Sequence, residues 1–198
     1  MLGTGADMDA HPDVKRALDK SATEPLSQVL SSSLSLAKRA GDAMFEKWLK
    51  LELNGYYNTN EALTKDVMVP KYRSVIGQYY DRFGRPLVID SRLAFINERP
   101  LREGIVELEE MLSRASEYYT LVDPIINEEL QTTFGVSVSQ FTFSSIQING
   151  IISAVRTQLI EHLSQIELHD PIASPTTAFP KDEVIELRPN FYGLGVKP

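Results

Sequence analysis

Residues 48–57 read WLKLELNGYY, and this stretch decides how the first half of the chain folds. One helical face is indicated by residues spaced i, i+3, i+4 and i+7, namely Phe45, Trp48, Leu49 and Glu52. Asn54 and Gly55 predict the end of the helix, because glycine readily adopts the positive φ that a helix C-terminus needs. Glu52 is therefore expected at a buried position beside Trp48.

The segment before this stretch predicts another helix. Ser21 and Glu24 have the spacing of a capping box, and Pro25 suits a first helical turn, which has no use for the missing N–H. Gly41 can end this helix in the left-handed conformation, and Asp42 can cap the helix that follows. Two consecutive helices joined by a tight corner are therefore expected.

The segment after the next polar loop has the alternation of β-structure. Residues 72–90 contain an alternating run, a DRFG turn and a second short run, PLVI, which together predict a β-hairpin. Gly84 occupies the turn position that needs an unusual φ. Pro70 marks the start of the hairpin, on an edge strand where a missing N–H costs no ladder hydrogen bond.

The second half of the chain returns to helical periodicity. Residues 100–116 and 124–134 predict helices, and residues 136–143 predict a short strand. The longest helix is expected at about 145–168, where one apolar stripe can serve as the central packing element. The stripe consists of Ile148, Ile152, Val155, Leu159, Leu163 and Ile166. Residues 169–198 are rich in proline and predict an extended tail, with one candidate strand at EVIELR (183–188).

These segments together predict an α+β fold. It is mainly helical, with a long C-terminal core helix and a small antiparallel sheet built around the hairpin. We assign residues 1–20 to an N-terminal arm, 21–168 to one domain and 169–198 to the extended tail.

Composition narrows the classes of function. The net charge of −7 argues against broad capture of nucleic acid, since phosphate is bound chiefly by clustered lysine and arginine. The chain has no cysteine, which excludes disulfides, thiolate metal sites and cysteine nucleophiles. No window approaches the roughly 18 to 20 apolar residues that cross a bilayer, and the N-terminus lacks a secretory pattern. A cytoplasmic protein with no membrane contact, no metal and no cofactor is expected.

Three stretches resemble, in order, the AbiTii domain of bacterial abortive infection. They are KWLKLELNGYY (47–57), VPKYRSVIGQYYDRFGRP (69–86) and GIISAVRTQLIEHLSQIE (150–167). The most specific patterns are W-x-x-x-E-L-N-G-Y and P-x-Y-R. The residues of these motifs, together with one arginine of the late helix, are Trp48, Glu52, Asn54, Gly55, Tyr56, Pro70, Tyr72, Arg73 and Arg156. The resemblance covers most of the chain and implies a role in prokaryotic antiviral defence, without implying a catalytic residue.

Glu52 has a predicted ion-pair partner. A carboxylate buried beside Trp48 is costly unless it is paired, and Arg73 lies on a strand expected to pack against this helix. We therefore predict a Glu52–Arg73 ion pair, completed by Tyr72 or Asn54. The structural interpretation is that the pair fixes the register of the hairpin on the helix, and the alternative is that it belongs to an active site.

Arg156 and His162 indicate an alternative function. An arginine followed after four to six residues by a histidine is the pattern of HEPN ribonucleases, where the pair stabilises phosphate and supports proton transfer. The pattern is short, and His162 shares the apolar stripe with Val155 and Leu159, which favours a core or boundary histidine. An RNA-cleaving toxin is therefore the alternative hypothesis.

Paired tyrosines suggest a surface for protein partners. The pairs begin at Tyr56, Tyr79 and Tyr118, and tyrosine commonly straddles a core boundary or anchors an interface. The acidic run ELEEM (107–111) is the wet side of a helix. No common catalytic motif occurs, so the leading hypothesis is a non-enzymatic defence component that binds a protein partner or a second copy of itself.

Overall fold

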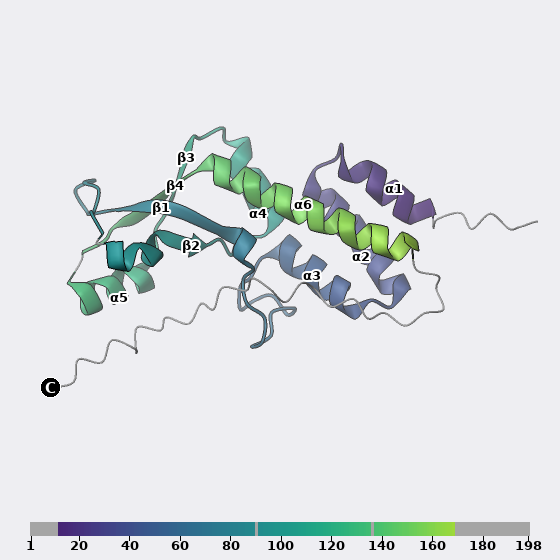
Figure 1. Ribbon diagram of the computed structural model, residues 1–198, viewed down its shortest axis with the longest axis horizontal. Helices are drawn as coiled ribbons and strands as arrows, with labels where there is room; N and C mark the ends of the chain where they lie inside the picture. The colour runs from purple at the N-terminus through teal and green to yellow at the C-terminus, as the bar shows by residue number, and fades with distance from the viewer. Residues whose placement is uncertain (1–11, 90, 136, 169–198) are drawn as a thin grey trace, which may run out of the picture. The chain divides into compact units, whose positions relative to one another are not determined.

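The computed structural model describes residues 12–168 apart from 90 and 136, and this part of the chain has the predicted α+β fold (Figure 1). Its helices are α1 (Pro12–Ser21), α2 (Leu26–Ala40), α3 (Ala43–Asn54), α4 (Ile105–Ser113), α5 (Pro124–Phe134) and α6 (Ser145–Leu168). Its strands are β1 (Ser74–Tyr80), β2 (Glu98–Pro100), β3 (Tyr118–Leu121) and β4 (Gln140–Ser144). Helices predominate, as expected.

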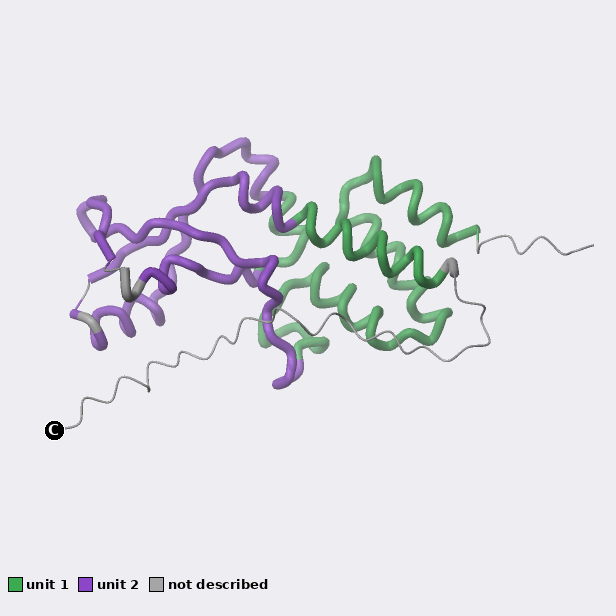
Figure 2. Tube along the Cα trace, in the orientation of Figure 1, with its two compact units in different colours: residues 1–63, 103–109, 152–179 green, residues 64–102, 110–151, 180–198 purple. Residues whose placement is uncertain are grey.

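The described residues divide into two compact units (Figure 2). Unit 1 contains residues 12–63, 103–109 and 152–168, and unit 2 contains residues 64–102 and 110–151. Unit 1 is helical, whereas unit 2 holds the sheet and α5. Helices α4 and α6 contribute residues to both units.

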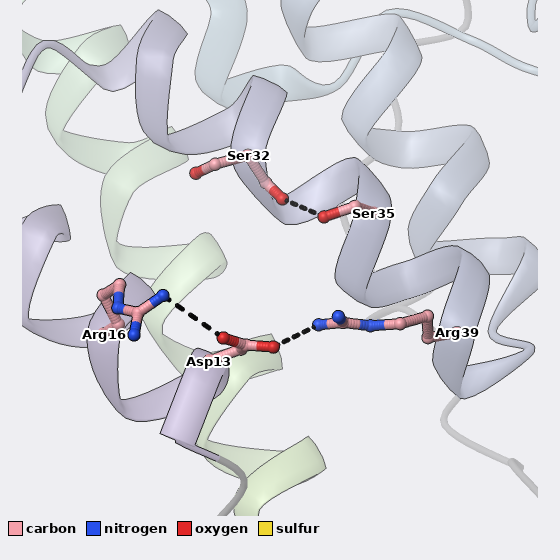
Figure 3. A network of polar contacts seen from close by, with 5 residues as sticks. All are labelled: Asp13, Arg16, Ser32, Ser35 and Arg39. Carbon is pink, nitrogen blue, oxygen red and sulfur yellow. Dashed lines mark hydrogen bonds and ion pairs between the residues drawn. The ribbon is translucent and has the colours of Figure 1, made fainter.

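Helix α1 was not predicted from the sequence, and it lies within residues that were expected to form an N-terminal arm. Its buried face is short, with Val14 1% and Ala17 4% exposed. Asp13 accepts hydrogen bonds from Arg16, at 3.4 Å, and from Arg39 of α2, at 2.7 Å (Figure 3). Because exposed ion pairs contribute little, burial of the two apolar side chains contributes most to the packing of α1.

The corner between α2 and α3 is confirmed. Gly41 ends α2 with a φ of 68°, in the left-handed conformation. The Asp42 carboxylate caps α3 by accepting a hydrogen bond from the Phe45 N–H at 2.9 Å. The buried face of α3 contains Phe45, Trp48, Leu49, Leu51 and Glu52, so the periodicity placed Glu52 on the correct side of the helix.

The sheet has the strand order β2-β1-β4-β3, and all neighbouring strands are antiparallel. Its registers place Val75 opposite Arg99, Tyr79 opposite Phe141, and Leu121 opposite Phe141. β1 is one of the two inner strands, so the sheet is antiparallel, as predicted, and includes the first half of the segment predicted to form the hairpin. Strand β4 confirms the predicted strand only in part, because it begins four residues later than expected.

The hairpin predicted at 72–90 forms only in part. The turn is present, with Gly84 at a φ of 75° and its N–H donating to the Asp81 carbonyl at 3.0 Å. After the turn, the chain makes a single bridge, between Tyr80 and Pro86, instead of the second strand expected at PLVI. β1 instead pairs with β2 and β4, which lie much later in the chain.

One face of the sheet is buried, and the other carries both polar and exposed apolar side chains. The buried face carries Val75, Tyr79, Phe141 and Phe143, each no more than 2% exposed. The rings of Tyr79 and Phe141 have their centroids 4.9 Å apart. On the other face, the hydroxyls of Thr120 and Thr142 lie 3.2 Å apart across β3 and β4.

The predicted long helix is confirmed as α6. Four residues of the predicted stripe are buried, namely Ile148, Val155, Leu159 and Leu163. Ile152 and Ile166 are half-buried, and Ile151 is buried in addition. The tail and its candidate strand lie outside the described residues. None of the described helices is both long and apolar enough to cross a membrane.

Candidate functional site

Glu52 is the buried carboxylate of the tryptophan-containing motif. Its side chain is 0% exposed, because its position four residues after Trp48 faces the interior of unit 1. The Tyr56 hydroxyl donates a hydrogen bond to Glu52 Oε1 at 2.6 Å, within the usual range for a hydroxyl bound to a carboxylate. Tyr56 was not among the partners expected for Glu52, although its four-residue spacing could have indicated it. Asn54, which was named as a partner, is exposed.

The Gly55 position of the motif ends α3. Gly55 has a φ of 84°, which favours glycine, and its carbonyl accepts a hydrogen bond from the Asn60 side-chain amide at 2.7 Å. The same amide donates to the Lys50 carbonyl at 3.1 Å, so Asn60 satisfies two carbonyls at the end of the helix. This part of the motif therefore has a structural explanation.

Arg73 is the buried cation of the P-x-Y-R motif. It is 0% exposed and ends a 3-10 turn, Lys71–Arg73, that immediately precedes β1. Its Nε donates to the Leu101 carbonyl at 3.1 Å, and the Leu101 N–H donates to the Arg73 carbonyl at 2.8 Å. Pro70 is extended and forms an isolated β-bridge just before the 3-10 turn, whereas Arg73 lies in that turn, one residue before the strand it was expected to belong to.

The Glu52–Arg73 ion pair stays a prediction. Glu52 belongs to unit 1 and Arg73 to unit 2, and each side chain is completely buried. A charged group removed from water needs compensating partners, which is the physical reason for the predicted pair. Tyr72, the other expected partner, is half-buried.

Arg156 binds the backbone of the turn between α1 and α2. Its Nη1 donates to the Ser21 carbonyl, and both Nη atoms lie 3.4 Å from the Glu24 carbonyl. Ser21 is the last residue of α1, where carbonyls lack helical partners and a positive charge is favourable. The guanidinium is therefore engaged in holding unit 1 together.

The capping box predicted from Ser21 and Glu24 is wrong. Helix α2 has no local side-chain cap. Instead, Glu109 of α4 accepts hydrogen bonds from the Leu26 N–H at 2.6 Å and from the Ser27 hydroxyl at 2.5 Å. One glutamate of the acidic run thus binds the N-terminus of a helix that begins 83 residues earlier in the chain, and does not simply face water.

His162 lies in an aromatic cluster of unit 1. Its ring centroid is 4.9 Å from that of Phe45 and 5.5 Å from that of Trp48. Burial lowers the pKa of His162 below its usual value, and the opposing effects of Asp42 and Glu161 are smaller. The engagement of Arg156 with carbonyls and of His162 with aromatic rings gives the ribonuclease alternative no support.

We expect His162→Phe to weaken the loss of stability in acid. Because the folded pKa of His162 lies below the unfolded value, the unfolded chain binds more protons as the pH falls through about 6.5. The wild type therefore loses free energy of unfolding on acidification, whereas the phenylalanine variant keeps the ring contacts and has no group that titrates at this position. The measurement is the melting temperature of both proteins between pH 8 and 5. Parallel pH profiles would contradict this role for His162.

A polar cluster that the sequence did not indicate occurs in unit 2. Arg99 of β2 forms an ion pair with Asp123 at 2.6 Å, and its guanidinium carbon lies 5.4 Å from the Phe141 ring centroid. Asp123 also caps α5 by accepting hydrogen bonds from the N–H groups of the first helical turn. Burial raises the pKa of Tyr79, and the nearby Arg99 partly opposes this. Arg99 and Asp123 are 24 positions apart in the chain, which explains why no local pattern revealed the pair.

The turn after β1 holds an exposed aromatic ring. Phe83 is 66% exposed, with the guanidinium carbons of Arg82 and Arg85 at 4.7 and 5.1 Å from its ring centroid. The Asp81 carboxylate accepts hydrogen bonds from the N–H groups of Phe83, at 2.8 Å, and Arg85, at 2.9 Å. The backbone hydrogen bond from Arg85 is the main cause of a lowered pKa of Asp81. We call residues 81–85 the aromatic turn.

The fold and its polar groups define the class of protein. It is an α+β protein whose motif residues include a buried carboxylate, Glu52, and a buried guanidinium, Arg73. Among the described residues, no group of three histidine, aspartate or glutamate side chains is arranged to hold a metal ion. The AbiTii family model matches residues 14–186, and the chain belongs to the AbiTii family. This membership supports a role in abortive-infection defence against viruses. No curated protein and no solved structure matches the chain.

Proposed function

We propose that this AbiTii protein acts in abortive infection by binding a protein partner or a second copy of itself. The family supplies the setting of antiviral defence. The aromatic turn supports the mode of action, because a large apolar ring held at a rigid, exposed tip is typical of an interface anchor.

The distribution of exposed apolar side chains supports the same proposal. Eleven large apolar side chains of the described residues are exposed, and eight of them belong to unit 2. These eight are Ile76, Phe83, Val88, Phe95, Tyr118, Val122, Ile125 and Ile146. Single exposed apolar residues are ordinary, but their concentration in one unit favours protein contacts there.

The aromatic turn is the observation that carries the proposal. Its hydrogen bonds to Asp81 fix the backbone before any partner arrives, so little conformational entropy is lost on binding. Phe83 offers apolar area, and Arg82 adds a charged group that can bind a carboxylate on the partner. Aromatic and arginine side chains together dominate the energetics of many interfaces.

We expect Phe83→Ser to reduce defence without unfolding the protein. Truncating an interface anchor costs about 2 kcal/mol or more of binding free energy, which is a roughly 30-fold weaker contact. The measurement is phage plating on cells that carry the complete defence locus, together with the melting temperature of the purified variant. The matched control is Met44→Ser in unit 1, since Met44 is 54% exposed. Full defence by Phe83→Ser would contradict the proposed role of this turn.

A further inference from the structure

The aromatic turn carries one cation that its own carboxylate does not neutralise. Arg85 forms an ion pair with Asp81 at 2.7 Å. Arg82 is exposed and lies over the Phe83 ring, but it forms no ion pair with any residue that the structure describes. The turn therefore presents a large apolar ring beside a guanidinium that is available to a carboxylate of another molecule, and both kinds of side chain are enriched among interface anchors.

Helix α5 presents groups that complement the aromatic turn. Ile125 is 71% exposed, and it is followed three and four residues later by Glu128, which is exposed, and Glu129, which is half-buried. This spacing places the three side chains on one face of the helix. Within the residues that the structure describes, neither carboxylate has an ion pair or a side-chain hydrogen bond. We call Ile125, Glu128 and Glu129 the α5 patch.

The aromatic turn and α5 are joined by hydrogen bonds within unit 2. The Asn127 side-chain amide of α5 donates to the Ser139 carbonyl at 3.3 Å, and the Ser139 N–H donates to the Tyr80 carbonyl at 2.8 Å. Tyr80 is the last residue of β1 and directly precedes Asp81 of the turn. Both features therefore lie at the same end of the sheet, where one partner can reach them together.

We propose that the partner is a second copy of this chain, and that the aromatic turn of each copy binds the α5 patch of the other. This inference rests on the proposed function and names both the partner and the second surface. Phe83 packs against the partner's Ile125, and Arg82 binds a carboxylate of the partner's α5 patch. In a two-fold dimer each contact occurs twice, so both features of both copies are used and the assembly is closed.

Charge complementarity favours a second copy as the partner. Each chain carries one apolar group beside a cation and one apolar group beside two carboxylates, so two copies supply each other with the matching surface. The net charge of −7 opposes association only weakly, because charges more than about 8 Å apart are largely screened at physiological ionic strength. The opposite charges that meet at the contact therefore decide whether two copies bind.

A charge exchange in the full chain tests the proposal. Arg82→Glu and Glu128→Arg each bring like charges together in both contacts of a dimer, and we expect either variant to dimerise at least about tenfold more weakly than the wild type. An equal mixture of the two variants should dimerise again, because each of its contacts pairs residue 82 and residue 128 of opposite charge. Light scattering over a range of protein concentrations, at about 0.15 M ionic strength, measures the molecular mass.

Glu117→Arg is the matched control. It changes the net charge by the same amount as Glu128→Arg, and Glu117 is also exposed. Glu117 directly precedes Tyr118, which pairs with Ser144 at the opposite end of β4 from the aromatic turn. We therefore expect this variant to dimerise like the wild type.

The outcomes are distinct. Weaker dimerisation of both single variants, recovery in their mixture and a dimeric control support the proposal, and recovery also shows that both variants fold. A wild-type monomer at all concentrations, or a dimer that neither charge change weakens, would overturn it. If the wild type is a monomer and Phe83→Ser still loses defence, the proposed function stands with a different protein as the partner. Full defence by Phe83→Ser would instead contradict the role of the aromatic turn in the proposed function.

Discussion

The Glu52→Ala variant is expected to lose about 3 to 5 kcal/mol of the free energy of unfolding if Glu52 forms the predicted ion pair, since this is the cost of removing one member of a buried charge pair. Glu52 is 0% exposed and accepts the 2.6 Å hydrogen bond from Tyr56, so the substitution also leaves a buried hydroxyl without its acceptor. Chemical denaturation of the purified protein measures the loss. A loss below about 1 kcal/mol would contradict a structural role for this carboxylate.

A double-mutant cycle with Arg73→Met tests the predicted ion pair. If the two charges are partners, each single substitution leaves the other charge buried alone, and the double variant loses less stability than the sum of the singles. Additive losses would show that Glu52 and Arg73 do not interact. Tyr56→Phe serves as the matched control, because it removes only the hydroxyl and should cost about 1 to 3 kcal/mol.

The Glu52→Gln variant separates the structural role from an active site. Glutamine keeps the shape and can still accept the hydrogen bond from Tyr56, but it carries no charge. Under the structural interpretation, any loss of defence accompanies a lower melting temperature. A variant that melts like the wild type and yet gives no defence would favour the active-site interpretation.

The features that the sequence predicted correctly depend on nearby residues. The corner at Gly41 and Asp42, the end of α3 at Gly55 and the course of α6 each follow from spacing within a few turns. The burial of Glu52 follows in the same way from its distance to Trp48 along one helix. Local periodicity was enough to place these groups on the correct faces.

The features that the sequence missed depend on distant residues. Glu109 caps a helix that begins 83 residues earlier, and β1 pairs with strands that follow it by about 20 and 60 residues, which no local pattern encodes. Local patterns predicted a capping box and a hairpin, but Glu109 caps α2 instead, and β2 and β4 pair with β1 instead. Helix α1 was missed although Val14, Ala17 and Leu18 have helical spacing, because this short pattern covers little more than one turn.

Gly104 illustrates the same limit, because nothing in its local sequence reveals how closely it approaches α3. A Cβ added at Gly104 would lie 2.3 Å from the Leu53 carbonyl oxygen and 3.0 Å from backbone atoms of Asn54 and Gly55. These contacts are with backbone atoms at the end of α3, which cannot move aside as easily as the far end of a flexible side chain. The Gly104 N–H also donates to Glu107 at 2.9 Å, so the position is fixed at the start of α4.

We therefore expect Gly104→Ala to destabilise the protein by at least about 2 kcal/mol, through steric overlap with the end of α3. The matched control is Gly150→Ala within α6, where an added Cβ meets nothing within 4 Å. Alanine there should stabilise the helix by about 0.5 to 1 kcal/mol, since it loses less backbone entropy on folding. Melting temperatures should thus move in opposite directions. An unchanged melting temperature for Gly104→Ala would mean that the loop before α4 can move away from α3, and that the end of the Glu52 helix is less tightly packed than its contacts indicate.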